Sequence, residues 1–228
     1  MTITRDTPLR GLPLAIIDTE TTGLPPCEVV EIAVLRHALT PEPWAETAEN
    51  TFVARLRPSI PITPEASKIT GIHDRDVRRA PTWVEVVALG QWCAGAVPMA
   101  FNAPFDFGAV KKQAEAAGDP IPPWPWLDPL VWARAMWGTG MDSPGNRLTT
   151  VAERLEIEPG PAHSAFGDAL TTARIARPLL ALLISEGGAP AMRTLGELLD
   201  WQHATALRVE ATMPERFRSW TALGVPGV

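Results

Sequence analysis

Four acidic side chains and one histidine stand where they could do chemistry together. They are Asp18, Glu20, Asp106, Asp168 and His163, drawn from three stretches of a chain of 228 residues. Carboxylates are the ligands that hard divalent cations such as Mg²⁺ and Mn²⁺ prefer, and a histidine can move a proton near neutral pH. These residue types are the ones that metal-assisted hydrolysis needs.

The first stretch, Ile16 to Leu24, places two acids at the end of an apolar run. Asp18 and Glu20 are two residues apart, so on a strand both side chains point to the same face. Open α/β sheets bind ligands beyond the ends of their strands, which favours a paired-carboxylate site here. The alternative is a pair of solvated acids that lead into a turn at Gly23.

The second stretch runs from Phe101 to Asp106. A strand is expected to end here, and Pro104 suits the first position of a helix, which puts Asp106 in the first helical turn. An acid in that turn is stabilised by the helix dipole without any further role. Asp106 therefore belongs to a site only if its carboxylate faces the same crevice as Asp18.

The third stretch carries Asp168 on a helix that we expect to begin at Ala165, on a face lined by small residues. A buried acid is costly unless something neutralises it, and a metal ion would do so. Ser164 suits the N-cap, which leaves His163 in the loop before the helix. That loop lets His163 and Asp168 face one substrate, because on a continuous helix they would lie about 140° apart. Otherwise His163 is a surface residue.

Around these stretches the pattern predicts short strands first and helices later. The expected strands lie at 14–17, 30–34, 52–56 and 97–101. The expected helices cover 64–69, 81–94, 104–117, 129–137, 148–155, 165–185 with a bend or break at Pro178, and 192–213. Alternating apolar residues in the second and third strands favour an antiparallel hairpin. The order predicts an α/β domain with a mixed sheet flanked by helices.

Composition is that of an ordinary globular protein, with 46% hydrophobic and 20% charged residues. No apolar run approaches the roughly 18–20 residues that cross a bilayer, so no membrane contact is expected. Two cysteines, Cys27 and Cys93, make no disulfide framework, and a reducing cytoplasm is the expected location. A net charge of −6 argues against a long nucleic-acid footprint but not against an enzyme that grips only a strand end.

The ordered set D-x-E, N-x-x-F-D and H-x-x-x-x-D resembles the DEDD exonucleases of the DnaQ-like, RNase H-like superfamily. That group includes proofreading subunits of bacterial replicative polymerases. The resemblance runs from about Leu14 to Arg177, and the stretches 63–74, 127–130 and 146–148 are similar as well. The chain has no tyrosine, and His163 stands five residues before Asp168, so it resembles the histidine (DEDDh) type.

This resemblance implies an RNase H-like sheet with three early antiparallel strands, and a 3′→5′ exonuclease using two Mg²⁺ or Mn²⁺ ions. Asp18, Glu20 and Asp168 would hold one ion. Asp18 would bridge to the second, which Asp106 would reach largely through water, and His163 would be the base. The residues expected around the terminal nucleotide are Thr21, Thr22, Gly23, Leu24, Ile72, Asn102 and Phe105. The roles of Asn102 and Phe105 could equally be structural.

The expected partner is the 3′ end of a single-stranded nucleic acid, with DNA favoured over RNA, and a polymerase subunit could bind as well. Two alternatives stay open: trimming of RNA or short oligonucleotides, and a catalytically silent module that binds nucleic acid or a polymerase. Residues 1–186 are expected to form the exonuclease domain. Residues 187–228 are expected to form a helical extension that packs on it or mediates contacts, self-association included.

Overall fold

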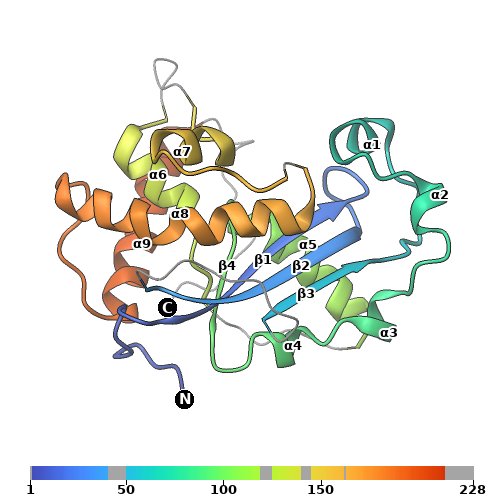
Figure 1. The fold of residues 1–228 in the computed structure, drawn as a ribbon, viewed down its shortest axis with the longest axis horizontal. Coiled ribbons are helices and arrows are strands. Elements are labelled where there is room, and N and C mark those ends of the chain that lie inside the picture. Colours follow the sequence, from blue (N-terminus) through green and yellow to red (C-terminus); the bar gives the residue numbers. More distant parts are fainter. Residues whose placement is uncertain (1, 41–49, 119–124, 140–144, 162, 214–228) are drawn as a thin grey trace.

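The computed structural model describes residues 2–40, 50–118, 125–139, 145–161 and 163–213. Its centre is a four-stranded sheet in the order β3-β2-β1-β4 (Figure 1). The strands are β1 (Pro13–Thr21), β2 (Val29–Ala38), β3 (Thr51–Arg55) and β4 (Val97–Met99). β1 to β3 pair antiparallel and β4 pairs parallel to β1, which confirms the mixed sheet with three early antiparallel strands.

Helices cover both faces of this sheet. Those before or just after β4 are α1 (Pro64–Thr70), α2 (Asp74–Val77), α3 (Trp83–Val86), α4 (Leu89–Trp92) and α5 (Ala103–Ala116). Those after it are α6 (Pro129–Trp137), α7 (Leu148–Arg154), α8 (Ala165–Ser185) and α9 (Leu195–Ala211). In Figure 1, α8 crosses in front of β1 and β2, and α5 lies behind them. The sheet is therefore the middle of three layers.

The core sits between β1, β2 and α8. Every residue from Val29 to Leu35 in β2 is buried, and Leu14 to Ile17 in β1 are almost inaccessible. On α8 the buried face carries small residues, Ala165, Ala169 and Ala173, as its sequence pattern predicts. Small side chains let the helix axis approach the sheet closely, and this brings the first turn of α8 to the end of β1.

The helix expected over 81–94 is wrong. Two one-turn helices, α3 and α4, stand there instead, separated by an extended residue at Val87. Both Val87 and Leu89 are buried, yet on one continuous helix they would point about 160° apart. Breaking the helix lets both side chains reach the core. By contrast, Pro178 does not interrupt α8, which runs unbroken through it.

In the region from Met192 to Met213, residues Leu195–Ala211 form one helix, α9, which packs against α6. Its first turn is held by the N-terminal segment, because Leu195 N–H donates to Thr7 O at 2.8 Å and Gly196 N–H donates to Arg5 O at 2.7 Å. Residues 214–228 of the expected extension lie outside the described part. Among the helices that the structure describes, none has the length and apolar character that crossing a membrane requires.

Candidate active site

Three of the predicted carboxylates meet at the end of β1. Asp18 and Glu20 lie two residues apart on this strand, and Asp168 lies in the first turn of α8. One carboxylate oxygen from each of the three residues lies within 4.8 Å of the other two. All three side chains are partly buried, and oxygen atoms this close suit a divalent cation.

Asp106 stands beside this group without belonging to it. It lies in the first turn of α5, as the sequence predicts, and is only 3% exposed. The hydroxyl of Thr19 donates to its carboxylate at 2.7 Å, which fixes the side chain on the β1 side of the helix. Its negative charge raises the pKa of Asp18, so the two acids act on each other across the gap between β1 and α5.

Burial raises the pKa of all four acids, and the charges of neighbouring acids raise those of Asp18 and Glu20 further. Burial, and then the charges of the other acids, raise the pKa of Asp18 well above its usual range. Burial and the charge of Asp168 raise the pKa of Glu20 to about 8. Burial raises the pKa of Asp106 to about 7, and burial raises that of Asp168 too. A cation bound among these carboxylates would counteract both causes of the raised pKa values. It would neutralise the negative charges and take the place of the water that burial removes.

His163 lies at the rim of the cluster. It is exposed, and its backbone is left-handed at φ 61°, in the loop before α8 as expected. Its N–H and its side-chain charge both lower the pKa of Asp168, against the larger effect of burial. The loop therefore holds His163 close to Asp168 and open to solvent, where its ring could reach a water molecule or a substrate.

Next to the acids lies a cavity of about 590 Å³. Its lining includes Thr21, Gly23, Leu24 and Phe105, four of the residues expected around a terminal nucleotide, together with Glu20. Leu24 is 84% exposed, and such exposure of a large apolar side chain is typical of a contact surface. The cavity is of a size that small-molecule ligands occupy.

Three other expected contacts are placed differently. Ile72 is 2% exposed and packs with Val30 and Val77, so it stays inside, while Ile69, 59% exposed, lies on the cavity wall. Thr22 is buried too: its N–H donates to Glu28 O at 2.8 Å, which closes the turn after β1.

Asn102 lies in a second hollow of about 440 Å³, which Arg134 and Arg147 also line. It has a left-handed backbone at the N-cap of α5.

Sequence reasoning missed two buried acids that accept hydrogen bonds from backbone N–H groups at the starts of α5 and α8. Asp128 is 1% exposed, and its carboxylate accepts from the N–H groups of Asn102 and Ala103 at 2.9 and 3.1 Å, at the start of α5. Glu31, 7% exposed, accepts from the N–H of Ala165 at 3.1 Å. The signals were an acid before a proline at 128–129 and an acid inside the apolar run of β2.

Comparison with known proteins points to one family. The model of the RNase_T family, described as exonuclease, matches residues 15–176. A DNA polymerase III subunit epsilon-like protein of Rhodobacter capsulatus is 32% identical over 200 residues, 85% of this chain and 27% of that protein. A PolC-type DNA polymerase III of Caldanaerobacter subterraneus is 33% identical over 163 residues, 70% of this chain and 11% of that protein. The chain thus spans about a quarter or less of the length of these two relatives.

Solved structures share the fold. The nuclease domain of 3′hExo, a DEDDh family member bound to rAMP, has a TM-score of 0.60 at 21% identity, over 81% of this chain and 96% of that one. Exonuclease X in complex with 5′ overhanging duplex DNA has a TM-score of 0.52 at 25% identity, over 83% of this chain and 99% of that one. With the matched model spanning most of the chain, this protein belongs to the RNase_T exonuclease family.

Proposed function

We propose that this protein removes nucleotides from the 3′ end of single-stranded DNA and releases nucleoside 5′-monophosphates. The observation that carries the proposal is the cluster of Asp18, Glu20 and Asp168, each of which offers one carboxylate oxygen within 4.8 Å of the other two. The cluster adjoins a cavity of about 590 Å³, to which Glu20 belongs as well. A phosphodiester seated at the cluster can therefore place its terminal nucleotide in the cavity.

The chemistry of the donor set fits two Mg²⁺ or Mn²⁺ ions. Asp18, Glu20 and Asp168 offer only hard oxygen ligands for the first ion. Asp18 would be shared with the second, which Asp106 would reach largely through water because it lies outside the close group. When bound, such a pair activates the attacking water and stabilises the leaving oxygen. Among the described residues, no hydrogen bond reaches the carboxylates of Asp18 and Glu20, so both keep their lone pairs for a cation.

His163 is the proposed general base. Its exposed place beside Asp168 allows the ring to take a proton from a water held between the acids and pass it to solvent. The left-handed backbone of His163, followed by the cap at Ser164, points the loop toward the cluster rather than along α8. The role of the chain here is to hold one ring nitrogen at the site of attack.

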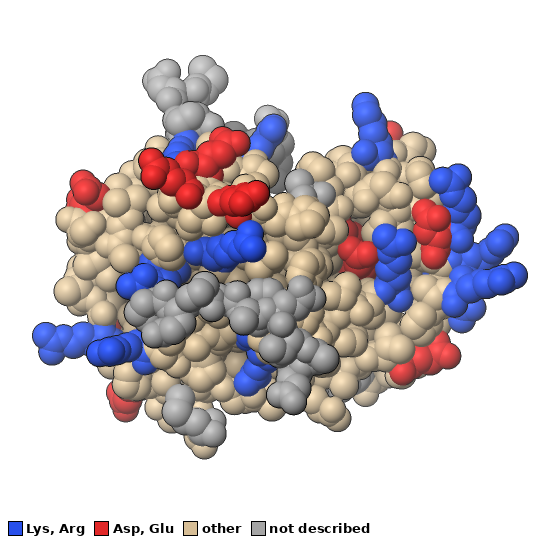
Figure 2. Space-filling model, in the orientation of Figure 1, with Lys and Arg blue, Asp and Glu red and all other residues tan. Residues whose placement is uncertain are grey.

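The cavity walls suit a stacked base more than a particular sequence. Leu24, Ile69 and Phe105 offer apolar surface, whereas a base edge would need matched donors and acceptors to be recognised. Exposed basic side chains gather over α1 and α2, on the right of Figure 2. They include Lys68, Arg75, Arg78 and Arg79. Since α1 lines the cavity, phosphates near its mouth would meet positive charge despite the acidic chain.

DNA is the favoured substrate because the two relatives compared above carry names of DNA polymerase III proteins. For the same reason a polymerase subunit is the proposed macromolecular partner, and DNA proofreading or repair the proposed setting. RNA trimming is the competing function, favoured by the bound rAMP of one structural relative. The complete set of acids and the histidine speak against a silent binding module.

The test uses single-stranded DNA and RNA of one sequence, each labelled at the 3′ or the 5′ end. We expect the 3′ label to leave first as a mononucleotide, in Mg²⁺ or Mn²⁺ and not in EDTA, with DNA degraded faster than RNA. Asp18→Asn is the control for a contaminating nuclease. Early release of the 5′ label would refute the polarity, and faster loss of RNA would move the protein to the competing function.

A further inference from the structure

Glu31 is an acid in the interior of the sheet, close to the catalytic cluster. It lies in β2 directly opposite Glu20 of β1 in the antiparallel register, and it is 7% exposed. Residues directly opposite share one face of the sheet, and like charges there destabilise it. Its charge also raises the pKa of Asp18 and Glu20. A carboxylate in this place needs specific partners.

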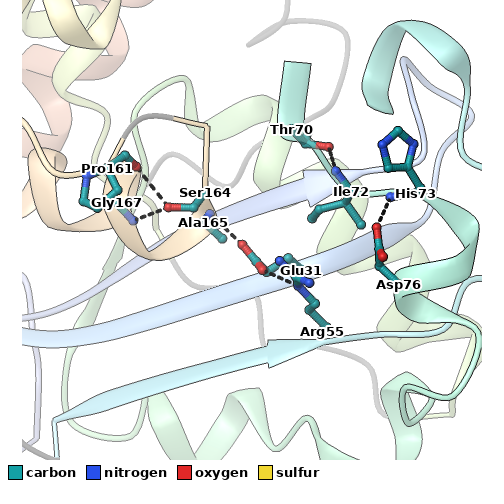
Figure 3. Close-up of polar contacts among 10 residues, drawn as sticks. All are labelled: Glu31, Arg55, Thr70, Ile72, His73, Asp76, Pro161, Ser164, Ala165 and Gly167. Atoms are coloured by element: carbon teal, nitrogen blue, oxygen red, sulfur yellow. Dashed lines mark hydrogen bonds and ion pairs between the residues drawn. The ribbon is translucent and has the colours of Figure 1, made fainter. Parts of the chain in front are cut away.

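The two oxygens of Glu31 bind different groups (Figure 3). Oε1 accepts from Nε of Arg55 at 3.0 Å, and Oε2 accepts from the backbone N–H of Ala165 at 3.1 Å. The Arg55 side chain is 53% exposed, so it balances charge from the protein surface. Ala165 is the first residue of α8, whose N–H has no partner within the helix. Glu31 thus joins β2 to the start of α8 across 134 residues of sequence.

The start of α8 and the loop before it form one block. Ser164 Oγ accepts from Gly167 N–H at 3.2 Å, and its hydroxyl donates to Pro161 O at 3.0 Å (Figure 3). A Cβ on Gly167 would lie 1.7 Å from Pro161 O, so only glycine lets the loop close this tightly. His163 lies inside the block, and Asp168 follows Ala165 by one helical turn. A shift of Ala165 therefore moves the proposed base and one proposed ligand together.

We propose that Glu31 is a positioning residue for catalysis. Its Oε2, by accepting from Ala165, sets the height and rotation of the first turn of α8 against the sheet, and so the distance of Asp168 from Asp18. This inference rests on the proposed function. Apolar packing of α8 holds the helix on the sheet but leaves small sliding motions, whereas a hydrogen bond at the first residue fixes one atom.

Two conservative variants distinguish the role of Glu31 as a hydrogen-bond acceptor from the role of its negative charge. Glu31→Gln keeps an oxygen of the same reach and removes the charge, and the exposed Arg55 can turn to water. Glu31→Asp keeps the charge and is one methylene too short to reach Ala165. We expect Glu31→Asp to lower both kcat and the Mn²⁺ affinity by about 10–100-fold, the usual effect of losing a group that orients a metal ligand. KM should change little, and Glu31→Gln should stay within about threefold of the wild type.

The measurements are steady-state kinetics on a labelled oligonucleotide, Mn²⁺ titration by calorimetry, and hydrogen exchange of the Ala165 amide. The control is Leu198→Ala, because Leu198 is fully buried on α9 and far along the chain from the block. It should lower the denaturant midpoint at least as much as Glu31→Asp does, with kcat and Mn²⁺ affinity unchanged.

Wild-type kcat and Mn²⁺ affinity in Glu31→Asp would overturn the proposal. So would an impaired Glu31→Gln beside a normal Glu31→Asp, because the charge and not the acceptor would then matter. Mn²⁺ binding and amide exchange need no substrate. If the wild type released no nucleotides while Glu31→Asp still bound Mn²⁺ more weakly, the proposed function would fail and the positioning role would stand.

Discussion

Asp128 is buried and Asp18 is partly buried, and their surroundings differ completely. The Asp128 carboxylate accepts from the N–H groups of Asn102, Ala103 and Leu130 at 2.8–3.1 Å. The Asp18 carboxylate accepts no hydrogen bond from the described residues and faces Asp106 and other acids. Amide protons satisfy the first acid within the fold. The Asp18 carboxylate is left to bind a group that the chain does not supply, such as a divalent cation.

Asp106 lies between these two cases. It is as enclosed as Asp128, and the Thr19 hydroxyl donates to its side chain at 2.7 Å. Backbone N–H groups of Thr19 and of Asp106 itself also lower its pKa, yet the larger effect of burial raises that pKa to about 7. Burial alone therefore does not mark a functional acid. A buried acid is a candidate for function when it also lacks hydrogen-bond donors and lies beside other negative charges.

The largest expected effect comes from Asp18→Asn. Removing this ligand should reduce exonuclease activity by at least about 10⁴-fold, because ions of this kind contribute several kcal/mol to the transition state. The metal-free variant should also unfold at a higher denaturant concentration than the wild type, since one repelling charge is gone. Release of the 3′ label in Mg²⁺ measures the exonuclease activity. Denaturant unfolding in EDTA measures the stability of the metal-free protein. A less stable metal-free variant would contradict our view of Asp18.

His163→Ala should have the next largest effect on turnover. A general base contributes about 10²–10⁴-fold, while the acids that hold the ions stay in place. Mn²⁺ affinity, measured by calorimetry, should therefore remain that of the wild type while kcat falls. An unchanged kcat would remove His163 from the mechanism.

Asp128→Ala should act on stability. Amides at the starts of α5 and α6 would lose their acceptor inside the protein, which costs at least about 1–3 kcal/mol in the free energy of unfolding. Chemical denaturation measures this change in the free energy of unfolding. EDTA is present so that bound metal does not contribute to the stability. Asp18→Asn is expected to raise the stability of the metal-free protein and Asp128→Ala to lower it. Changes of the same sign would contradict the different roles given to these two acids.

Stability should also depend on pH. In the folded protein the pKa of Glu20 is raised from 4.5 to about 8, and that of Asp106 from 3.8 to about 7. Between these values the folded state binds more protons than the unfolded state, so the metal-free protein should lose stability as the pH rises. Saturating Mg²⁺ should reverse the slope, because binding displaces the protons. Unfolding midpoints from pH 5 to about 8, with and without Mg²⁺, would show both slopes; a flat metal-free profile would argue against the crowded acids.

Local patterns were sufficient for the parts of the site that lie on one element. The two-residue spacing of Asp18 and Glu20 on a strand, and the proline-started first turn that carries Asp106, depend only on backbone geometry. The N-cap at Ser164 and the loop place of His163 follow in the same way. Family resemblance added their grouping, which no single segment shows.

Other features could not be predicted because they depend on distant partners. Burial of Ile72 and the choice of Ile69 for the cavity wall depend on how α1 rests on β2. The break at Val87 follows from the core that lies on both sides of it.

The strands, most helices and the residue types at their ends follow from local sequence, because dihedral preferences and side-chain periodicity act within a few residues. Which acids accept hydrogen bonds from the chain and which accept none depends instead on contacts between distant segments. Contacts such as Glu31 with Ala165 or Thr19 with Asp106 join residues 134 and 87 positions apart, and no local rule reaches that far.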